Sequence, residues 1–170
     1  MVARRSTLAL VLYGADEVAA PQYRPAVPTD AAGCIQLRGM TRENPIRAAR
    51  LASLGITAES SSKSIGAGEV IGHVCTDGGK LVGYCFGVRE TGEIQVLALL
   101  PDYENRGIGK RLLSGVVEEL RSLGFKRLFL GCSRNPAHRS YGFYRHLGWR
   151  SAGELDAHGD EVLELWSDSP

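Results

Sequence analysis

Two apolar runs around a short polar turn stand out in the middle of the chain. Residues 70–75 and 81–88 flank Asp77-Gly78-Gly79, a sequence typical of the turn in a β-hairpin. A second turn at Thr91-Gly92 leads into a third apolar run, residues 93–100. This pattern predicts three consecutive strands.

Helical spacing replaces the strand pattern after residue 106. Apolar residues recur at intervals of three and four up to Leu123, and Gly124 is positioned to end a helix over 107–123. The rest of the chain predicts a strand at 127–131, a helix at 136–147 and strands around 149–155 and 161–166.

The N-terminal half predicts a short strand at 22–26, followed by a helix that begins at Pro28-Thr29-Asp30. A second helix is expected from about residue 44 to 54, with Pro45 in its first turn. Residues 58–68 are rich in serine and glycine, which predicts a flexible loop or a binding lid.

This order of elements predicts an α/β (α+β) fold with a mixed sheet and helices on both faces. The length of 170 residues favours a single domain, expected over 21–168. Residues 1–20 are expected to be a flexible extension. The alternative is a cleaved signal peptide, because Arg4-Arg5 precedes the apolar run 8–12, although that run is too short to span a membrane.

Composition narrows the classes of partner. The net charge of +1 gives no electrostatic case for a nucleic-acid or membrane partner. The four cysteines are scattered, without metal-ligand or disulfide spacing, so we expect reduced thiols, no metal and a cytoplasmic location.

The most informative segment is 97–113, where an apolar strand runs into a polar loop and then a helix that begins within Arg106-Gly107-Ile108-Gly109. Glycines allow an anion to approach the backbone, and the helix N-terminus offers it free N–H groups. These features predict a ligand that carries phosphate. The alternative is a tight turn whose glycines serve packing alone.

The same segment, with Pro101-Asp102-Tyr103 and Leu112-Leu113, resembles the signature of the GNAT superfamily of N-acetyltransferases. A second block, residues 135–149, is similar to the superfamily's Asn…Tyr-x-x-x-Gly-aromatic helix. The resemblance covers roughly residues 22–166. It implies a six- to seven-stranded mixed sheet, splayed between two parallel strands, with acetyl-CoA bound in the splay as acyl donor.

The resemblance also implies a set of cofactor contacts. Backbone groups of one strand would pair with the pantetheine arm, from Leu97, Ala98 and Leu99. Main-chain amides of the loop would hold the pyrophosphate, around Asn105, Arg106, Gly107, Ile108, Gly109 and Lys110. Asn135 would hydrogen-bond the cofactor, although two residues are inserted between it and Tyr144. Glu104 departs from the superfamily, which usually has Gln or Arg there, and a carboxylate would repel a pyrophosphate unless it is paired.

Two residues are candidates for the chemistry. Tyr144 lies four residues before Gly148, where the superfamily commonly has the tyrosine that protonates the thiolate of CoA; the alternative is a core aromatic residue. Glu93 matches the glutamate base of histone-type members, or is a solvated residue at a strand start. Strict alternation would put Glu93 on the face of Gln95, Leu97 and Leu99.

The expected function is therefore transfer of an acetyl group from acetyl-CoA to a primary amine of a small molecule or protein, by direct attack in a ternary complex. The alternatives are a non-catalytic acyl-CoA-binding regulatory module and an unrelated phosphate-ligand binder. The chain is expected to act alone or as a homodimer. Residues 41–44 are expected either to border the acceptor or to cap the next helix. His138, His146 and Cys132 are expected to have no catalytic role.

Overall fold

The computed structural model describes residues 19–167, so the predictions for residues 1–18 lie outside the described part of the chain. The strands are β1 (Gln22–Pro25), β2 (Val70–Asp77), β3 (Lys80–Val88), β4 (Ile94–Leu99), β5 (Arg127–Cys132), β6 (Arg150–Leu155) and β7 (Glu161–Trp166). The helices are α1 (Ala31–Arg38), α2 (Ala48–Ser53), α3 (Ala58–Gly66), α4 (Ile108–Ser122) and α5 (Arg139–His146), with short 3₁₀ turns η1 (Pro28–Asp30) and η2 (Pro101–Tyr103).

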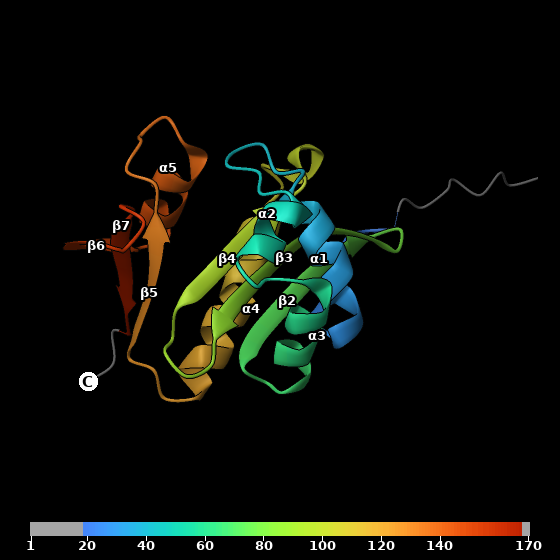
Figure 1. Ribbon diagram of the computed structural model, residues 1–170. Helices are drawn as coiled ribbons and strands as arrows, with labels where there is room; N and C mark the ends of the chain where they lie inside the picture. Colours follow the sequence, from blue (N-terminus) through green and yellow to red (C-terminus); the bar gives the residue numbers. More distant parts are fainter. Residues whose placement is uncertain (1–18, 168–170) are drawn as a thin grey trace, which may run out of the picture.

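The strands form two antiparallel sheets, one of order β1-β2-β3-β4 and one of order β5-β7-β6. A parallel bridge between Glu93 and Phe129 joins the sheets where β4 and β5 begin. Beyond that bridge the two strands separate, toward the top of the view in Figure 1. The predicted splay between two parallel strands of a seven-stranded mixed arrangement is confirmed.

Helices cover both faces of the four-stranded sheet, with α1 and α3 on one face and α4 on the other (Figure 1). Glycines in β3 allow α4 to lie close. A Cβ atom at Gly83 would lie 3.1 Å from the Leu112 side chain, and one at Gly87 would lie 2.7 Å from Val116. The face under α4 therefore has little side-chain bulk on β3, and the helix that follows the predicted phosphate loop packs directly on the sheet.

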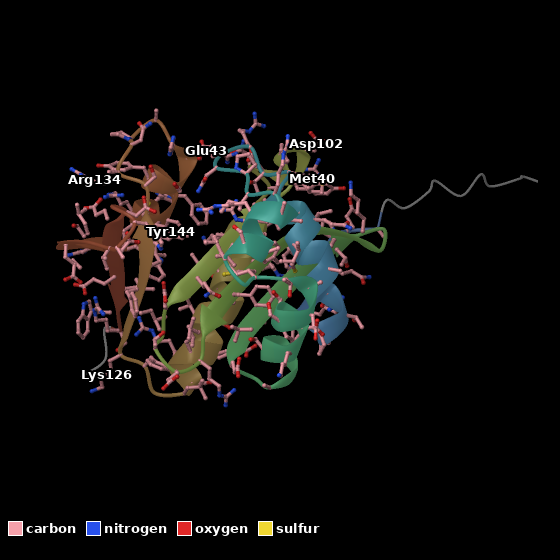
Figure 2. The ribbon with its side chains drawn as sticks, viewed as in Figure 1. Met40, Glu43, Asp102, Lys126, Arg134 and Tyr144 are labelled. Carbon is pink, nitrogen blue, oxygen red and sulfur yellow. The ribbon has the colours of Figure 1, made fainter. Side chains whose placement is uncertain are left out.

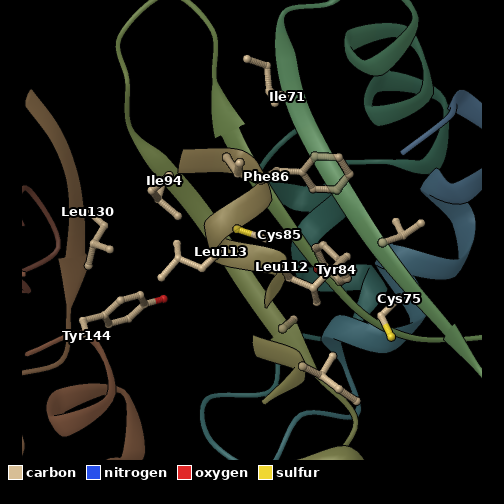
Figure 3. Packing of buried hydrophobic residues seen from close by; sticks show 14 of the residues in the cluster. Ile71, Cys75, Tyr84, Cys85, Phe86, Ile94, Leu112, Leu113, Leu130 and Tyr144 are labelled. Carbon is tan, nitrogen blue, oxygen red and sulfur yellow. The ribbon is translucent and has the colours of Figure 1, made fainter. Parts of the chain in front are cut away.

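One hydrophobic core links the two sheets (Figure 3). Leu128 and Leu163 of the smaller sheet and Val82 of the larger sheet are each fully buried in it. Tyr144 and Trp149 extend the core from the α5 region. The two sheets are therefore held together by shared side-chain packing, although one backbone bridge alone joins β4 to β5 among the described residues.

A bulge in β4 breaks its alternation. Ile94 pairs with Gly87, whereas Val96 pairs with Phe86, so one extra residue is inserted. Ile94 consequently shares the α4-facing side with Leu97, and it is buried. The expectation that Glu93 shares the face of Leu97 and Leu99 is wrong, because a single inserted residue exchanges the two faces of a strand.

The prediction of a loop at 58–68 is also wrong, because residues 58–66 form α3. Thr57 caps this helix: its hydroxyl accepts from the Ser60 amide at 3.1 Å, and the Ser60 hydroxyl accepts from the Thr57 amide at 2.9 Å. Ile65 packs against the core. A reciprocal cap with serine in the third position, together with tertiary packing, outweighs the poor helix propensity of the serines.

Two other helices start later than predicted. The helix expected from about residue 44 begins at Ala48 with Arg47 as its N-cap, and Asn44 lies before it with φ of 47°. Residues 41–44 therefore do not cap it. The helix expected from Pro136 begins at Arg139, because Asn135 and Pro136 belong to a turn closed by the His138 amide and the Asn135 carbonyl at 3.0 Å.

Candidate active site

The open end of the splay carries a free helix N-terminus. Gly107 caps α4 without a side-chain hydrogen bond, and the first amide bonded within the helix is that of Arg111, to the Gly107 carbonyl at 3.1 Å. Within residues 19–167, no protein group accepts from the amides of Ile108, Gly109 and Lys110. Such amides, aligned with the helix dipole, form a favourable site for an anion.

The backbone of this loop depends on residues that tolerate a positive φ. Asn105 has φ of 61° and Gly107 has φ of 75°. A Cβ atom at Gly107 would meet nothing within 4 Å, so this glycine leaves open space beside the free amides. Gly109 differs, because its Cβ would lie 3.3 Å from Leu99 and 3.6 Å from Phe143. Gly107 keeps the loop accessible, whereas Gly109 serves close packing.

Arg106 is positioned by an aromatic side chain. Its guanidinium lies 4.9 Å from the ring centroid of Tyr103. The Tyr103 hydroxyl donates a hydrogen bond to Asp77 at 2.8 Å, which ties the loop to the end of β2. Lys110 is exposed beside it. The predicted positive charge therefore lies at the helix N-terminus, although a cation–π contact of this exposed kind contributes only about 0.5–1 kcal/mol.

Tyr144 reaches from α5 toward the gap between the sheets, and Figure 3 shows its hydroxyl directed to the side where Leu113 lies. Its ring packs edge-on against Phe143 and Trp149, with centroid distances of 5.1 and 6.0 Å. In the described part of the chain its hydroxyl has no hydrogen-bond partner. Burial raises the pKa of this phenol well above its usual range, so it stays protonated at neutral pH.

The edges of β4 and β5 provide a second feature of the site. Each is an edge strand of its sheet, and past the Glu93–Phe129 bridge no ladder joins them within residues 19–167. Leu97, Ala98 and Leu99 pair with β3 on one side only. An extended chain could therefore add to this edge through main-chain hydrogen bonds.

Two predicted site residues remain, Glu93 and Asn135. Glu93 lies at the closed end of the splay, and Asn135 bonds to its own turn. Glu93 is half-buried at the closed end of the splay, and within residues 19–167 its carboxylate has no partner. The Asn135 side chain is exposed, and its Oδ1 accepts from the Ala137 amide at 3.0 Å. The structure therefore places Glu93 at the bridge that joins the two sheets, and Tyr144 in the core beside Phe143 and Trp149.

Two arginines near the loop were missed in the sequence. Arg42, from the α1–α2 connection, donates through Nε to Glu104 at 2.9 Å, and Arg139, at the start of α5, donates to the same carboxylate oxygen. The second Nη group of Arg139 donates to Asn105 Oδ1 at 2.8 Å. Glu104 is therefore paired, which removes the repulsion expected from its sequence position. No local pattern marks these arginines, since they are 62 and 35 residues from Glu104.

Among the described residues, no group of three or more His, Cys, Asp or Glu side chains is arranged to hold a metal ion. Cys132 is buried, as predicted for a small apolar side chain, while His146 is exposed. No helix within residues 19–167 is both long and apolar enough to cross a bilayer.

Residues 44–149 match the model of the acetyltransferase (GNAT) family. The chain belongs to this family. A 62-residue stretch is 32% identical to the spermine/spermidine N(1)-acetyltransferase of Bacillus subtilis, covering 36% of this chain and 40% of that relative. The chain thus spans well under two thirds of the relative's length in this match.

GNAT structures also match the fold. The PaiA N-acetyltransferase of Thermoplasma acidophilum, solved with coenzyme A, superposes with a TM-score of 0.73 at 17% identity, over 88% of this chain and all of that one. The yncA protein of Salmonella typhimurium, solved with acetyl-CoA, gives 0.69 at 15% identity, over 89% of this chain and 96% of that one. At these identities the likeness establishes the GNAT fold, as predicted.

Proposed function

We propose that this protein transfers the acetyl group of acetyl-CoA to a primary amine by direct attack in a ternary complex. The observation that carries the proposal is the unpaired, protonated Tyr144 hydroxyl directed into a splay whose strand edges are free. Among the described residues no fully buried side-chain oxygen or nitrogen lacks a partner, so this unpaired oxygen is accessible to solvent, and a ligand atom can replace water there. Family membership supports the same reaction class.

In this proposal the cofactor contacts divide along the site. Main-chain groups of Leu97, Ala98 and Leu99 receive the pantetheine arm as an added strand. The amides at residues 105–110 hold the pyrophosphate at the N-terminus of α4. Asn135 contributes its free amide N–H groups, since its oxygen is already bonded to the Ala137 amide. Two structural neighbours were solved with coenzyme A or acetyl-CoA bound, which supports the choice of cofactor.

The reaction requires a neutral amine, because the nitrogen lone pair attacks the thioester carbonyl carbon. The carbon–sulfur bond then breaks, leaving an amide and a thiolate, while the attacking nitrogen loses one proton. We propose that Glu93 accepts this proton through water, because its carboxylate lies at the closed end of the splay and has no partner within residues 19–167. A general base with this task contributes about 10²–10⁴-fold to the rate.

The raised pKa of Tyr144 decides whether its hydroxyl can give up its proton or can only donate a hydrogen bond. A phenol with a pKa above 10 is a weaker acid than a thiol, whose ordinary pKa is about 8.5. Complete proton transfer from Tyr144 to the thiolate is therefore uphill. We propose that the hydroxyl donates a hydrogen bond to the sulfur as negative charge develops, and that Glu93 then returns the amine proton through water to the thiolate, which restores both the thiol and the base.

The acceptor in this proposal is a small polyamine-type molecule or a protein amino group. The Bacillus subtilis relative is named for spermine and spermidine, which makes polyamines the first acceptors to test. The matched stretch covers only part of that relative, so peptide amines and aminoglycosides belong in the same panel.

The test is acceptor-dependent release of CoA thiol, followed with a thiol reagent, against that panel. Tyr144→Phe is expected to abolish most of the release, whereas Tyr141→Phe on the same helix is expected to preserve it. Binding of CoA without release for any amine would favour a non-catalytic acyl-CoA module. Acetyl-CoA at 100 times its dissociation constant should raise the free energy of unfolding by about 2.7 kcal/mol. No stabilisation by millimolar acetyl-CoA would remove the cofactor assignment.

A further inference from the structure

We propose that Arg42 and Arg139 form a two-arginine clamp that binds the phosphate groups of the acyl-CoA nucleotide, and that Glu104 holds the clamp in place. This inference rests on the proposed function. It assigns the clamp to residues outside the glycine loop, contributed by the α1–α2 connection and by the first turn of α5.

Glu104 brings the two guanidinium groups to one point. Its side chain is only 14% exposed, and its Oε2 accepts from both Arg42 and Arg139. Asn105 adds a second contact to Arg139, at 2.8 Å from Oδ1. Both arginines are therefore fixed at Glu104, which shortly precedes the Gly107 cap of α4 in the chain.

Both arginines have N–H groups that donate to no acceptor among the described residues. Arg42 contacts Glu104 through Nε alone, and in the described part of the chain neither of its Nη groups has an acceptor. Arg139 uses one N–H of each Nη group, so its Nε–H is free. Their side chains are 58% and 43% exposed, which leaves the free N–H groups accessible. A guanidinium fork of this kind matches phosphate geometry.

The backbone of Arg139 is fixed as well. Its amide donates to both carboxylate oxygens of Glu43, at 3.0 and 3.1 Å. In Figure 2 Glu43 lies at the upper edge of the molecule, between α5 and the turn that carries Asp102. Segments from three parts of the chain thus meet at the open end of the splay. Because the two arginine side chains are already held in place, phosphate binding costs little of their conformational entropy.

The charges of Arg42, Arg139 and Glu104 favour the binding of an anion beside the two guanidinium groups. Glu104 contacts two arginines, so its single carboxylate leaves this pair of guanidinium groups with a net positive charge. A dianionic phosphate offers more acceptor oxygens than one carboxylate. It can engage the free Nη groups of Arg42 and the Nε of Arg139 without breaking the contacts to Glu104.

The experiment measures dissociation constants by calorimetry for CoA, for dephospho-CoA, which lacks the 3′-phosphate, and for pantetheine, which carries no phosphate. Arg42→Ala and Arg139→Ala are each expected to weaken CoA about ten-fold and to leave pantetheine unchanged. The CoA-to-dephospho-CoA comparison assigns each arginine to the pyrophosphate or to the 3′-phosphate. Arg150→Ala, which removes an exposed arginine from β6, is the matched control and is expected to change none of the three constants.

Two further variants keep the test decisive. Glu104→Ala removes a negative charge from an anion site, so simple repulsion predicts tighter CoA binding, whereas loss of the clamp predicts weaker binding, which we expect. Arg139→Lys keeps the charge without the fork and is expected to bind CoA with an intermediate constant. It also serves if Arg139→Ala does not fold.

Unchanged CoA constants in both arginine variants would overturn the clamp, as would an equal loss of CoA and pantetheine, which indicates a deformed pocket. Tighter binding in Glu104→Ala would overturn the role given to Glu104. All of these results leave the acetyltransferase proposal intact when the wild-type protein binds CoA, whereas a wild-type protein that binds none of the three ligands contradicts the proposed function itself.

Discussion

Glu93 and Phe129 form the parallel bridge at which β4 and β5 meet. The Glu93 carbonyl also accepts from the Val88 amide at 2.8 Å, so its backbone is held by both neighbouring strands. This bridge fixes the base of the splay and places the Glu93 side chain at its closed end. We propose that Glu93 accepts the amine proton from this position through water.

Replacing Glu93 with Gln tests that role. We expect kcat to fall about 10²–10⁴-fold on the pH plateau, because the variant cannot accept the amine proton, and we expect the low-pH limb of the profile to disappear. The acetyl-CoA dissociation constant should not change. Glu90→Gln, an exposed glutamate in the same turn, is the control. An unaltered pH profile in Glu93→Gln would assign the base role to water or another residue.

Tyr144→Phe removes only the hydroxyl. This hydroxyl has no partner in the described residues, so its removal breaks no hydrogen bond within the protein. The free energy of unfolding should therefore decrease by no more than about 0.5 kcal/mol. The turnover number should fall about a hundred-fold, since one hydrogen bond to developing charge contributes about 2.7–4 kcal/mol at most. Denaturant unfolding and steady-state kinetics check both parts. Equal losses in Tyr141→Phe would show a helix effect instead of a chemical one.

Gly107→Ala tests the loop. At φ of 75° an alanine costs about 1 kcal/mol of stability, although its Cβ meets no atom within 4 Å. Acetyl-CoA affinity should fall by more than ten-fold, because the amides at the start of α4 shift. Gly124→Ala is a matched control at the other end of α4, with φ of 97° and equally open space. Equal melting temperatures with equal affinities in the two variants would contradict the loop assignment.

Stability at high pH depends on buried thiols. Burial, with a smaller effect from Asp30, raises the pKa of Cys34 from 9.0 to about 12. A raised pKa in the folded state means that the contribution to stability is complete below pH 9. It is lost as the pH rises from 9 toward 12, by about 1.4 kcal/mol per pH unit for this thiol.

Urea unfolding at pH 7, 9 and 10.5 under reducing conditions measures this loss. Cys34→Ala should show a smaller decrease between pH 9 and 10.5 than the wild-type protein. The burial of Cys85 raises its pKa as well, so a decrease should persist in the variant. Parallel pH curves for the two proteins would contradict the contribution of Cys34.

Local pattern was sufficient wherever one segment holds its own structure. The hairpin of β2 and β3 follows from a turn between apolar runs, and α4 follows from helical spacing between two glycines. Prediction from composition failed for α3, because specific contacts stabilise this helix in spite of its many serines. The Thr57–Ser60 cap and the packing of Ile65 against the core stabilise α3, and the amino-acid composition of the segment indicates neither contact.

By itself the sequence determined the strand, loop and helix of the proposed phosphate site, the family resemblance and the place of Tyr144 on the last helix. Only the tertiary structure decided which face Glu93 lies on, because an inserted residue in β4 cannot be recognised from alternation. It also decided that Glu104 is paired. Its partners, Arg42 and Arg139, come from distant parts of the chain, and such an ion pair exists only after folding brings those parts together.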